Sequence, residues 1–123
     1  MKITGFCPLI VTKNAEAAMK VFEDLGFERQ HTKTDIEGGA NTNYAMKDAN
    51  GNRISIASSE KIPQDLTAIN INVDNFQEAY DFLLAHGFVN PRGDKVTDTS
   101  SSKATLLFAP SGFAVNISEH IKK

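Results

Sequence analysis

The chain has 123 residues, of which 41% are hydrophobic and 23% charged, so it is long enough for one compact domain with a real core. Its 13 basic and 15 acidic residues give a formal net charge of −2, which disfavours nucleic acid and anionic membranes as partners. The sequence has no apolar run of membrane-spanning length and no secretory h-region, and its single cysteine, Cys7, cannot form an internal disulfide. We therefore expect a cytoplasmic protein in which Cys7 is a buried structural thiol rather than a nucleophile.

The first half of the chain predicts one strand, one helix and three further strands. The strand is expected at residues 3–11, and Asn14 is a good N-cap for a helix that ends at Leu25, before Gly26. The apolar residues at helical spacing predict its buried face: Ala15, Ala18, Met19, Phe22 and Leu25. Strands are then expected at residues 27–35, 43–47 and 53–58, with turns at Gly38-Gly39 and at residues 48–51.

The second half predicts the same order of elements after a linker at residues 61–65. A strand is expected at residues 68–73, followed by a helix with Asn75 and Glu78 at its start and Gly87 at its end. The apolar face of this helix comprises Phe76, Ala79, Tyr80 and Leu83. Three strands are expected at residues 88–92, 103–108 and 114–118, with a turn at 110–112 and a frayed end from residue 118.

The two halves match each other in register. Gly26 and Gly87 differ by 61 residues, as do Gly51 and Gly112. Residues 8–11 match residues 70–73 with a shift of 62, so one residue is expected to differ at the strand–helix junction. The repeat predicts an α+β domain made of two tandem βαβββ modules, residues 1–60 and 66–123.

Strand alternation sorts the side chains into two faces. Large aliphatic residues are expected to face the helices: Leu9, Val11, Ile54, Ile56, Ile69, Ile71, Val73, Val115 and Ile117. The opposite faces are expected to hold Phe6, Pro8, Ile10, Arg53, Ser55, Ala57, Ala68, Asn70, Asn72, Ala114, Asn116 and Ser118. A solvated sheet face is one interpretation of this second set, but its apolar members suit a ligand-binding cleft better.

These segments resemble the vicinal oxygen chelate superfamily, which includes glyoxalase I, bleomycin resistance proteins and extradiol dioxygenases. The resemblance rests on residues 9–11 leading into a helix, on the helix end at residues 22–27 and on the hairpin at residues 48–54, each echoed in the second half. It implies an open, U-shaped, eight-stranded mixed barrel around a cleft, in a homodimer.

The resemblance also implies four metal-ligand positions, one on the first and one on the last strand of each module. Carried onto this sequence they are Phe6, Ser55, Ala68 and Asn116. Phe and Ala have no lone pair for a metal, and neutral Ser and Asn oxygens bind divalent ions weakly. A one-residue slip of the register would add only Cys7 as a ligand. We therefore expect no metal and no other cofactor.

Three classes of function follow from this pattern. The leading hypothesis is a metal-free protein that holds an unknown small organic molecule in the cleft, using Phe6, Pro8, Ile10, Arg53, Ser55, Asn70, Asn72 and Asn116, without catalytic residues. The alternative is a metal-dependent lyase, isomerase or dioxygenase of the same superfamily with an atypical site. A dimeric scaffold without a ligand is the third. The histidines His31, His86 and His120 form no metal-binding spacing, and no pair of carboxylates is placed for acid–base chemistry.

Overall fold

The computed structural model describes residues 1–36, 41–59, 62, 64–98 and 102–120; for residues 31–36, 41–42 and 97 it describes the backbone alone. The described residues form two compact units. The α1 unit comprises Cys7–Thr67, and the α2 unit comprises Met1–Phe6 together with Ala68–Lys123. The first six residues thus pack with the second half of the chain, which differs from the predicted module boundaries. The predicted turn at Gly38-Gly39 lies outside the described residues, as do parts of the predicted 61–65 linker.

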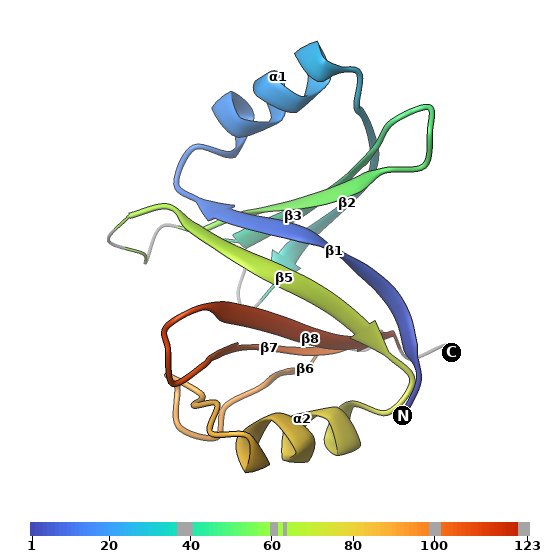
Figure 1. Cartoon of the computed structure of the whole chain (residues 1–123). Coiled ribbons are helices and arrows are strands. Elements are labelled where there is room, and N and C mark those ends of the chain that lie inside the picture. The colour runs from blue at the N-terminus through green and yellow to red at the C-terminus, as the bar shows by residue number, and fades with distance from the viewer. Residues whose placement is uncertain (37–40, 60–61, 63, 99–101, 121–123) are drawn as a thin grey trace. The chain divides into compact units, whose positions relative to one another are not determined.

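The element order contains the predicted βαβββ module twice. The elements are β1 (Ile3–Thr12), α1 (Ala15–Leu25), β2 (Glu28–Ile36), β3 (Asn41–Lys47), β4 (Arg53–Ser58), β5 (Leu66–Val73), α2 (Phe76–Ala85), β6 (Thr97–Asp98), β7 (Ser102–Phe108) and β8 (Ala114–His120) (Figure 1). Strands and helices therefore occur in the order that the repeat predicts, and the α+β class is confirmed. Neither described helix is long and apolar enough to cross a membrane.

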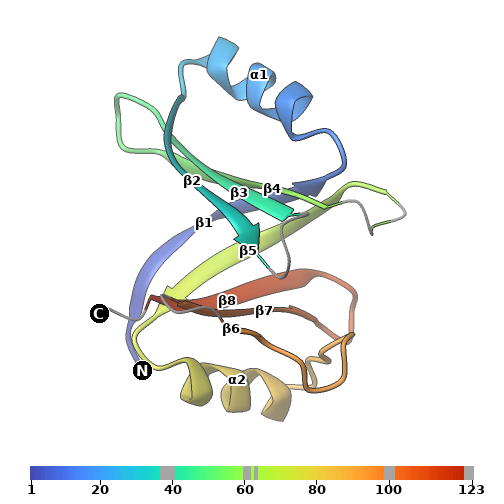
Figure 2. The ribbon, with the colours of Figure 1, turned by 180° about the vertical axis from the view of Figure 1, so that it is seen from behind.

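In the α1 unit the strand order is β2-β3-β4-β1, with the β4–β1 pair parallel and the others antiparallel. Helix α1 lies over one face of these strands, as Figures 1 and 2 both show. The core between them consists of Ala15, Met19, Met46, Ile54 and Ile56, with Ile10, Ala18, Phe22, Phe27 and Tyr44 packed around it. The predicted helix face is thus confirmed except at its last residue. Leu25 is 68% exposed, because Gly26 ends the helix and the Phe27 ring packs on Phe22 in its place.

The α2 unit repeats this arrangement with strand order β5-β8-β7-β6, in which β5 and β8 are parallel. Its core consists of Val73, Phe76, Ala79, Leu107, Val115 and Ile117, with Ile71, Tyr80, Leu83, Phe88 and Val96 packed against it. All four predicted core residues of α2 belong to this group. Strand β8 continues to His120, which pairs with Ser102, so the predicted frayed end beginning at residue 118 was wrong for residues 118–120.

The predicted strand at residues 88–92 was also wrong. Only one bridge forms there, between Val89 and Phe108, and the strand beside β7 is instead the short β6. Pro91 has no N–H for a sheet, and the Asn90 side chain folds the chain into a turn. Its Oδ1 accepts from the Arg92 amide at 2.9 Å, and its Nδ2 donates to the Lys95 carbonyl at 2.8 Å.

Equivalent asparagines begin the two helices. The Asn14 side chain accepts from the Ala17 amide, and the Asn75 side chain accepts from the Glu78 amide, each at 3.1 Å. These contacts confirm both predicted N-caps. The Glu78 carboxylate does not return to Asn75 as a capping box would; it pairs with the N-terminal amine of Met1. This ion pair ties the start of the chain to α2.

Two features of the structure disfavour alanine at position 87, which is Gly87 in this chain. Its φ is 89°, and a Cβ added there would lie 2.9 Å from Cγ of Pro110. Gly26 has a φ of 111° but an open environment. We expect Gly26→Ala to lower the free energy of unfolding by about 1 kcal/mol, the cost of a left-handed alanine. Gly87→Ala should cost more by about a further 1 kcal/mol, because the Pro110 ring must move.

Urea unfolding of the two variants, with Pro110→Ala as background, checks this expectation. In the Pro110→Ala background the extra cost of Gly87→Ala should disappear. Equal costs for Gly26→Ala and Gly87→Ala in the natural background would show that the contact with Pro110 has no energetic effect.

Candidate functional site

The register of β1 differs from the predicted one by one residue. Leu9 pairs with Ser55 and Ile10 pairs with Ile56, and paired residues of a sheet point to the same face. Ile56 is fully buried in the α1 core, so Ile10 faces the helix, and it packs against that core. Leu9 therefore lies on the opposite face with Ser55. The predicted sides of β1 were wrong, because three consecutive aliphatic residues have no alternation from which a face can be read.

This correction removes three residues from the predicted ligand-binding set. Ile10 belongs to the α1 core, and Phe6 and Pro8 share its side of β1 by alternation. Phe6 is 65% exposed. The helix N-caps Asn14 and Asn75 are 61 residues apart. Leu9 and Asn70 are also 61 residues apart, and so are their strand partners Ser55 and Asn116. The repeat therefore keeps one shift of 61 throughout, and the residue equivalent to Ala68 is Cys7, not Phe6.

The other predicted faces agree with the structure, except that Ile69 of β5 is 37% exposed and is not part of the α2 core. In β4, Ile54 and Ile56 belong to the α1 core, which leaves Arg53, Ser55 and Ala57 on the opposite side. In β5 and β8, Ile71, Val73, Val115 and Ile117 face α2. The opposite side of these two strands, the polar face of the α2 unit, consists of Ala68, Asn70, Asn72, Ala114, Asn116 and Ser118.

Neutral hydrogen bonds connect the side chains of this polar face. Asn116 Nδ2 donates to Asn70 Oδ1 at 2.8 Å, and the Ser118 hydroxyl donates to Asn72 Oδ1. Each bond joins residues that are direct partners in the parallel β5–β8 ladder. Gly5 approaches the same face, since a Cβ there would lie 2.8 Å from Asn72 Nδ2. The face is thus a row of amide and hydroxyl groups without a formal charge.

On the corresponding face of the α1 unit, the Cys7 side chain lies close to Ser55, although the direct strand partner of Ser55 is Leu9. The Cys7 Sγ and Ser55 Oγ atoms lie 3.6 Å apart, and Ser55 is 8% exposed. With the corrected register, the four positions at which the superfamily resemblance implies metal ligands are Cys7, Ser55, Ala68 and Asn116. Alanine offers no donor atom, Ser55 and Asn116 are neutral and hydrogen-bonded, and one thiolate alone does not hold a divalent ion. These residues do not fit the metal.

The remaining described residues offer no replacement. Among them, no three His, Cys, Asp or Glu side chains are close enough together to hold a metal ion. His86 lies at the end of α2, where its Nδ1 is 2.7 Å from the Phe82 carbonyl. His120 is exposed at the end of β8.

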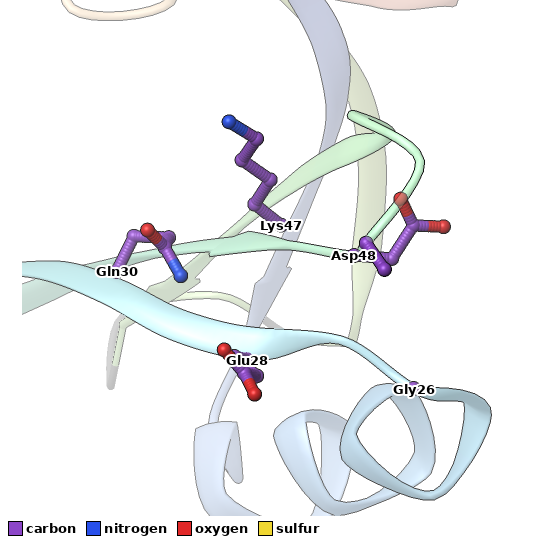
Figure 3. Close-up of a pocket in the computed structure, with 6 residues that line it drawn as sticks. Gly26, Glu28, Gln30, Lys47 and Asp48 are labelled. Atoms are coloured by element: carbon purple, nitrogen blue, oxygen red, sulfur yellow. The ribbon is translucent and has the colours of Figure 1, made fainter.

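A separate groove of about 330 Å³ lies at the end of α1, lined by Gly26, Glu28, Gln30, Lys47, Asp48 and Ala49 (Figure 3). The Asp48 carboxyl accepts hydrogen bonds within the β3–β4 turn, from the Asn52 side-chain amide and from the backbone amides of Asn52 and Asn50. These bonds, above all the one from the Asn52 side chain, hold the pKa of the Asp48 carboxyl below its usual value. The Lys47 side chain points away from α1. The groove is polar, its lining has charges of both signs, and none of the predicted binding residues is among the residues that line it.

The comparison with protein families decides what kind of protein this is. The model of the Glyoxalase/Bleomycin resistance protein/Dioxygenase superfamily matches residues 7–117. The chain belongs to this superfamily. A search among curated proteins finds no match.

Solved structures with the same fold are distant in sequence. A superfamily member from Vibrio splendidus 12B01 has 15% identity and a TM-score of 0.61, over 96% of this chain and 99% of that one. Methylmalonyl-CoA epimerase from Mycobacterium tuberculosis has 13% identity and a TM-score of 0.64, over 95% and 88%. A V278E glyoxalase I mutant from Zea mays has 14% identity and a TM-score of 0.67, over 96% of this chain and 43% of that one. At these identities the likeness confirms the glyoxalase/bleomycin resistance fold and no particular activity.

Proposed function

We propose that this superfamily member binds a small organic molecule without a metal and without turning it over. The observation that supports the proposal most strongly is the chemistry of the four equivalent positions, Cys7, Ser55, Ala68 and Asn116. Three of them, Cys7, Ser55 and Asn116, already form hydrogen bonds within the protein, and Ala68 has no donor atom at all. A Lewis-acid reaction would have no stable place for its metal there.

The polar face of the α2 unit supports binding without catalysis. Its groups, Asn70, Asn72, Asn116 and Ser118, can exchange hydrogen bonds with a polar ligand, since each amide has both a donor and an acceptor. None of them is a general acid or base at neutral pH. Such a face positions a ligand by hydrogen bonds and leaves its covalent structure unchanged.

A thermal-shift screen of small molecules in the presence of a chelator tests the proposal. A ligand at one hundred times its Kd should stabilise the protein by about 2.7 kcal/mol, which raises Tm by several degrees. The gain should shrink in Asn116→Ala and persist in Asn50→Ala, which changes an exposed asparagine of the β3–β4 turn. Stabilisation that requires added divalent metal would contradict the proposal and favour the enzyme alternative.

A further inference from the structure

One buried acceptor of the α1 unit has no partner. Among the described side-chain atoms, Asn43 Oδ1 is buried and accepts no hydrogen bond. A buried polar atom without a partner costs free energy, and one way in which a native protein offsets this cost is a bound molecule that donates to the atom. Asn43 pairs with Ala57, and Ala45 pairs with Ser55, so Asn43 lies on the side of the sheet opposite to α1. We call this side the non-helix face of the α1 unit.

The same face has two cations at its other end. Lys47 of β3 pairs directly with Arg53 of β4. Lys47 lies four residues from Asn43 along β3, and Arg53 lies two residues from Ser55 along β4. Among the described residues, neither of these cations takes part in a salt bridge. By contrast, Arg29 on the helix side pairs with both Glu16 and Glu23. Figure 3 shows the Lys47 side chain pointing away from α1.

Two acidic groups lie near these cations, but neither is paired with them. Glu28 is the β2 partner of Lys47. Asp48 follows Lys47, and its two oxygens accept from Asn52 and Asn50. In the described part of the chain no salt bridge joins either carboxylate to Lys47 or Arg53, so the N–H groups of both cations stay available to an anion.

The surface between the two ends consists of small side chains. Ala45 of β3 lies there beside Ser55 of β4, and the buried Leu9 of β1 is the partner of Ser55, while Ala57 lies beside Asn43. At about 3.4 Å per residue, Asn43 and Lys47 lie about 14 Å apart along β3. The flexible Lys and Arg side chains can shorten the distance that a ligand must span to about 10 Å.

We propose that the non-helix face of the α1 unit binds a small organic anion, which accepts hydrogen bonds from Lys47 and Arg53 at one end and donates one to Asn43 Oδ1 at the other. The apolar middle of the ligand lies on Ala45, and Ala57 borders its Asn43 end. This inference rests on the proposed metal-free binding function and names the chemical class of the ligand. It selects organic acids with an N–H or O–H group and disfavours cations.

The experiment compares two fluorescent probes that differ only by a sulfonate group. 6-(p-Toluidino)naphthalene-2-sulfonate has an N–H donor and a sulfonate at opposite ends of an apolar naphthalene ring, whereas N-(p-tolyl)-2-naphthylamine lacks the sulfonate. We expect the sulfonate probe to bind saturably, one per chain, at least about tenfold more tightly than the neutral probe, and more weakly as salt increases. Equal affinities for the two probes would overturn the proposal.

Substitutions separate the two ends of the site. Lys47→Gln and Arg53→Gln should each weaken the sulfonate probe several-fold and leave the neutral probe unchanged. Lys20→Gln, which removes the same charge from the exposed face of α1, should change neither. Asn43→Leu should weaken both probes by a similar factor, because both have the N–H. If Lys20→Gln weakens the sulfonate probe as much as Lys47→Gln does, or if Asn43→Leu affects neither probe, the proposed site is wrong.

Failure of this site and failure of the proposed function give different results. Neutral or cationic ligands that stabilise the chelator-treated protein, with the sulfonate probe insensitive to Lys47→Gln, would overturn the anion site and leave metal-free binding intact. Dependence of every ligand on added metal would overturn the proposed function, while the preference for the sulfonate probe could persist. Melting curves of each variant show that the fold is retained.

Discussion

Replacing Leu107 with alanine is expected to lower the free energy of unfolding by about 3 kcal/mol, within a range of about 2 to 5 kcal/mol. Leu107 is fully buried in the α2 unit, where its β8 partner Val115 belongs to the same core. Truncation removes apolar surface from the core and leaves a cavity that the surrounding strands fill only partly. Urea unfolding followed by circular dichroism measures the change.

Leu84→Ala on α2 is the matched control, because the same atoms are removed from a residue that is 40% exposed. It should cost less than about 1 kcal/mol. A similar cost for Leu84→Ala and Leu107→Ala would contradict the strand alternation that places Leu107 against α2.

Replacing Ser55 with cysteine is expected to create a disulfide with Cys7 under mild oxidation. The Sγ and Oγ atoms are now 3.6 Å apart and lie on the same side of β1 and β4. The bond would join residues 48 positions apart. Closing a loop of this length stabilises a protein by about 2–4 kcal/mol when the geometry is unstrained. Mass spectrometry detects the loss of two hydrogens, and unfolding under oxidising and reducing conditions measures the gain.

The control moves the thiol by one residue. A variant with Cys7→Ser, Phe6→Cys and Ser55→Cys should form no disulfide, because position 6 lies on the opposite side of the strand. Cross-linking from position 6 but not from position 7 would restore the register predicted from the sequence and contradict the observed pairing of Leu9 with Ser55.

Locally determined features were predictable from the sequence. The N-caps Asn14 and Asn75, the helix end at Gly26 and the turn at 48–51 each depend on a few neighbouring residues with a specific conformational preference. Together with the repeat they were sufficient for the α+β class and for the superfamily resemblance, which the family comparison confirms.

The face of β1 was not predictable by the same means. Leu9, Ile10 and Val11 are all apolar, so either register leaves a hydrophobic side chain on each face. The pairing with β4 decides between them. The constant shift of 61 between the N-caps Asn14 and Asn75 was present in the sequence and would have indicated the correct alignment.

Asn43 and Lys47 were missed as candidate binding residues for a related reason. Neither belongs to a motif, and their significance depends on which β4 residues stand opposite them. The short turn between β3 and β4 does fix Lys47 opposite Arg53, so counting back along both strands could have placed Asn43 and Ala45 on the face of Ser55. That Asn43 Oδ1 lacks a partner is visible only in the folded chain.

The small-molecule ligand, the homodimer and the cytoplasmic location stay predictions. The binding roles of Asn70, Asn72 and Asn116 stay predictions as well. The structure shows that these residues share one face and that hydrogen bonds join Asn70 to Asn116 and Asn72 to Ser118.

Metal content of the protein, purified without chelators and dialysed against metal-free buffer, tests the central claim most directly. The non-ligating set Cys7, Ser55, Ala68 and Asn116 predicts far less than one divalent ion per chain, and the same content after incubation with zinc, nickel or manganese followed by desalting. One equivalent of a divalent metal per chain, retained through desalting and released together with bound ligand by a chelator, would contradict the account.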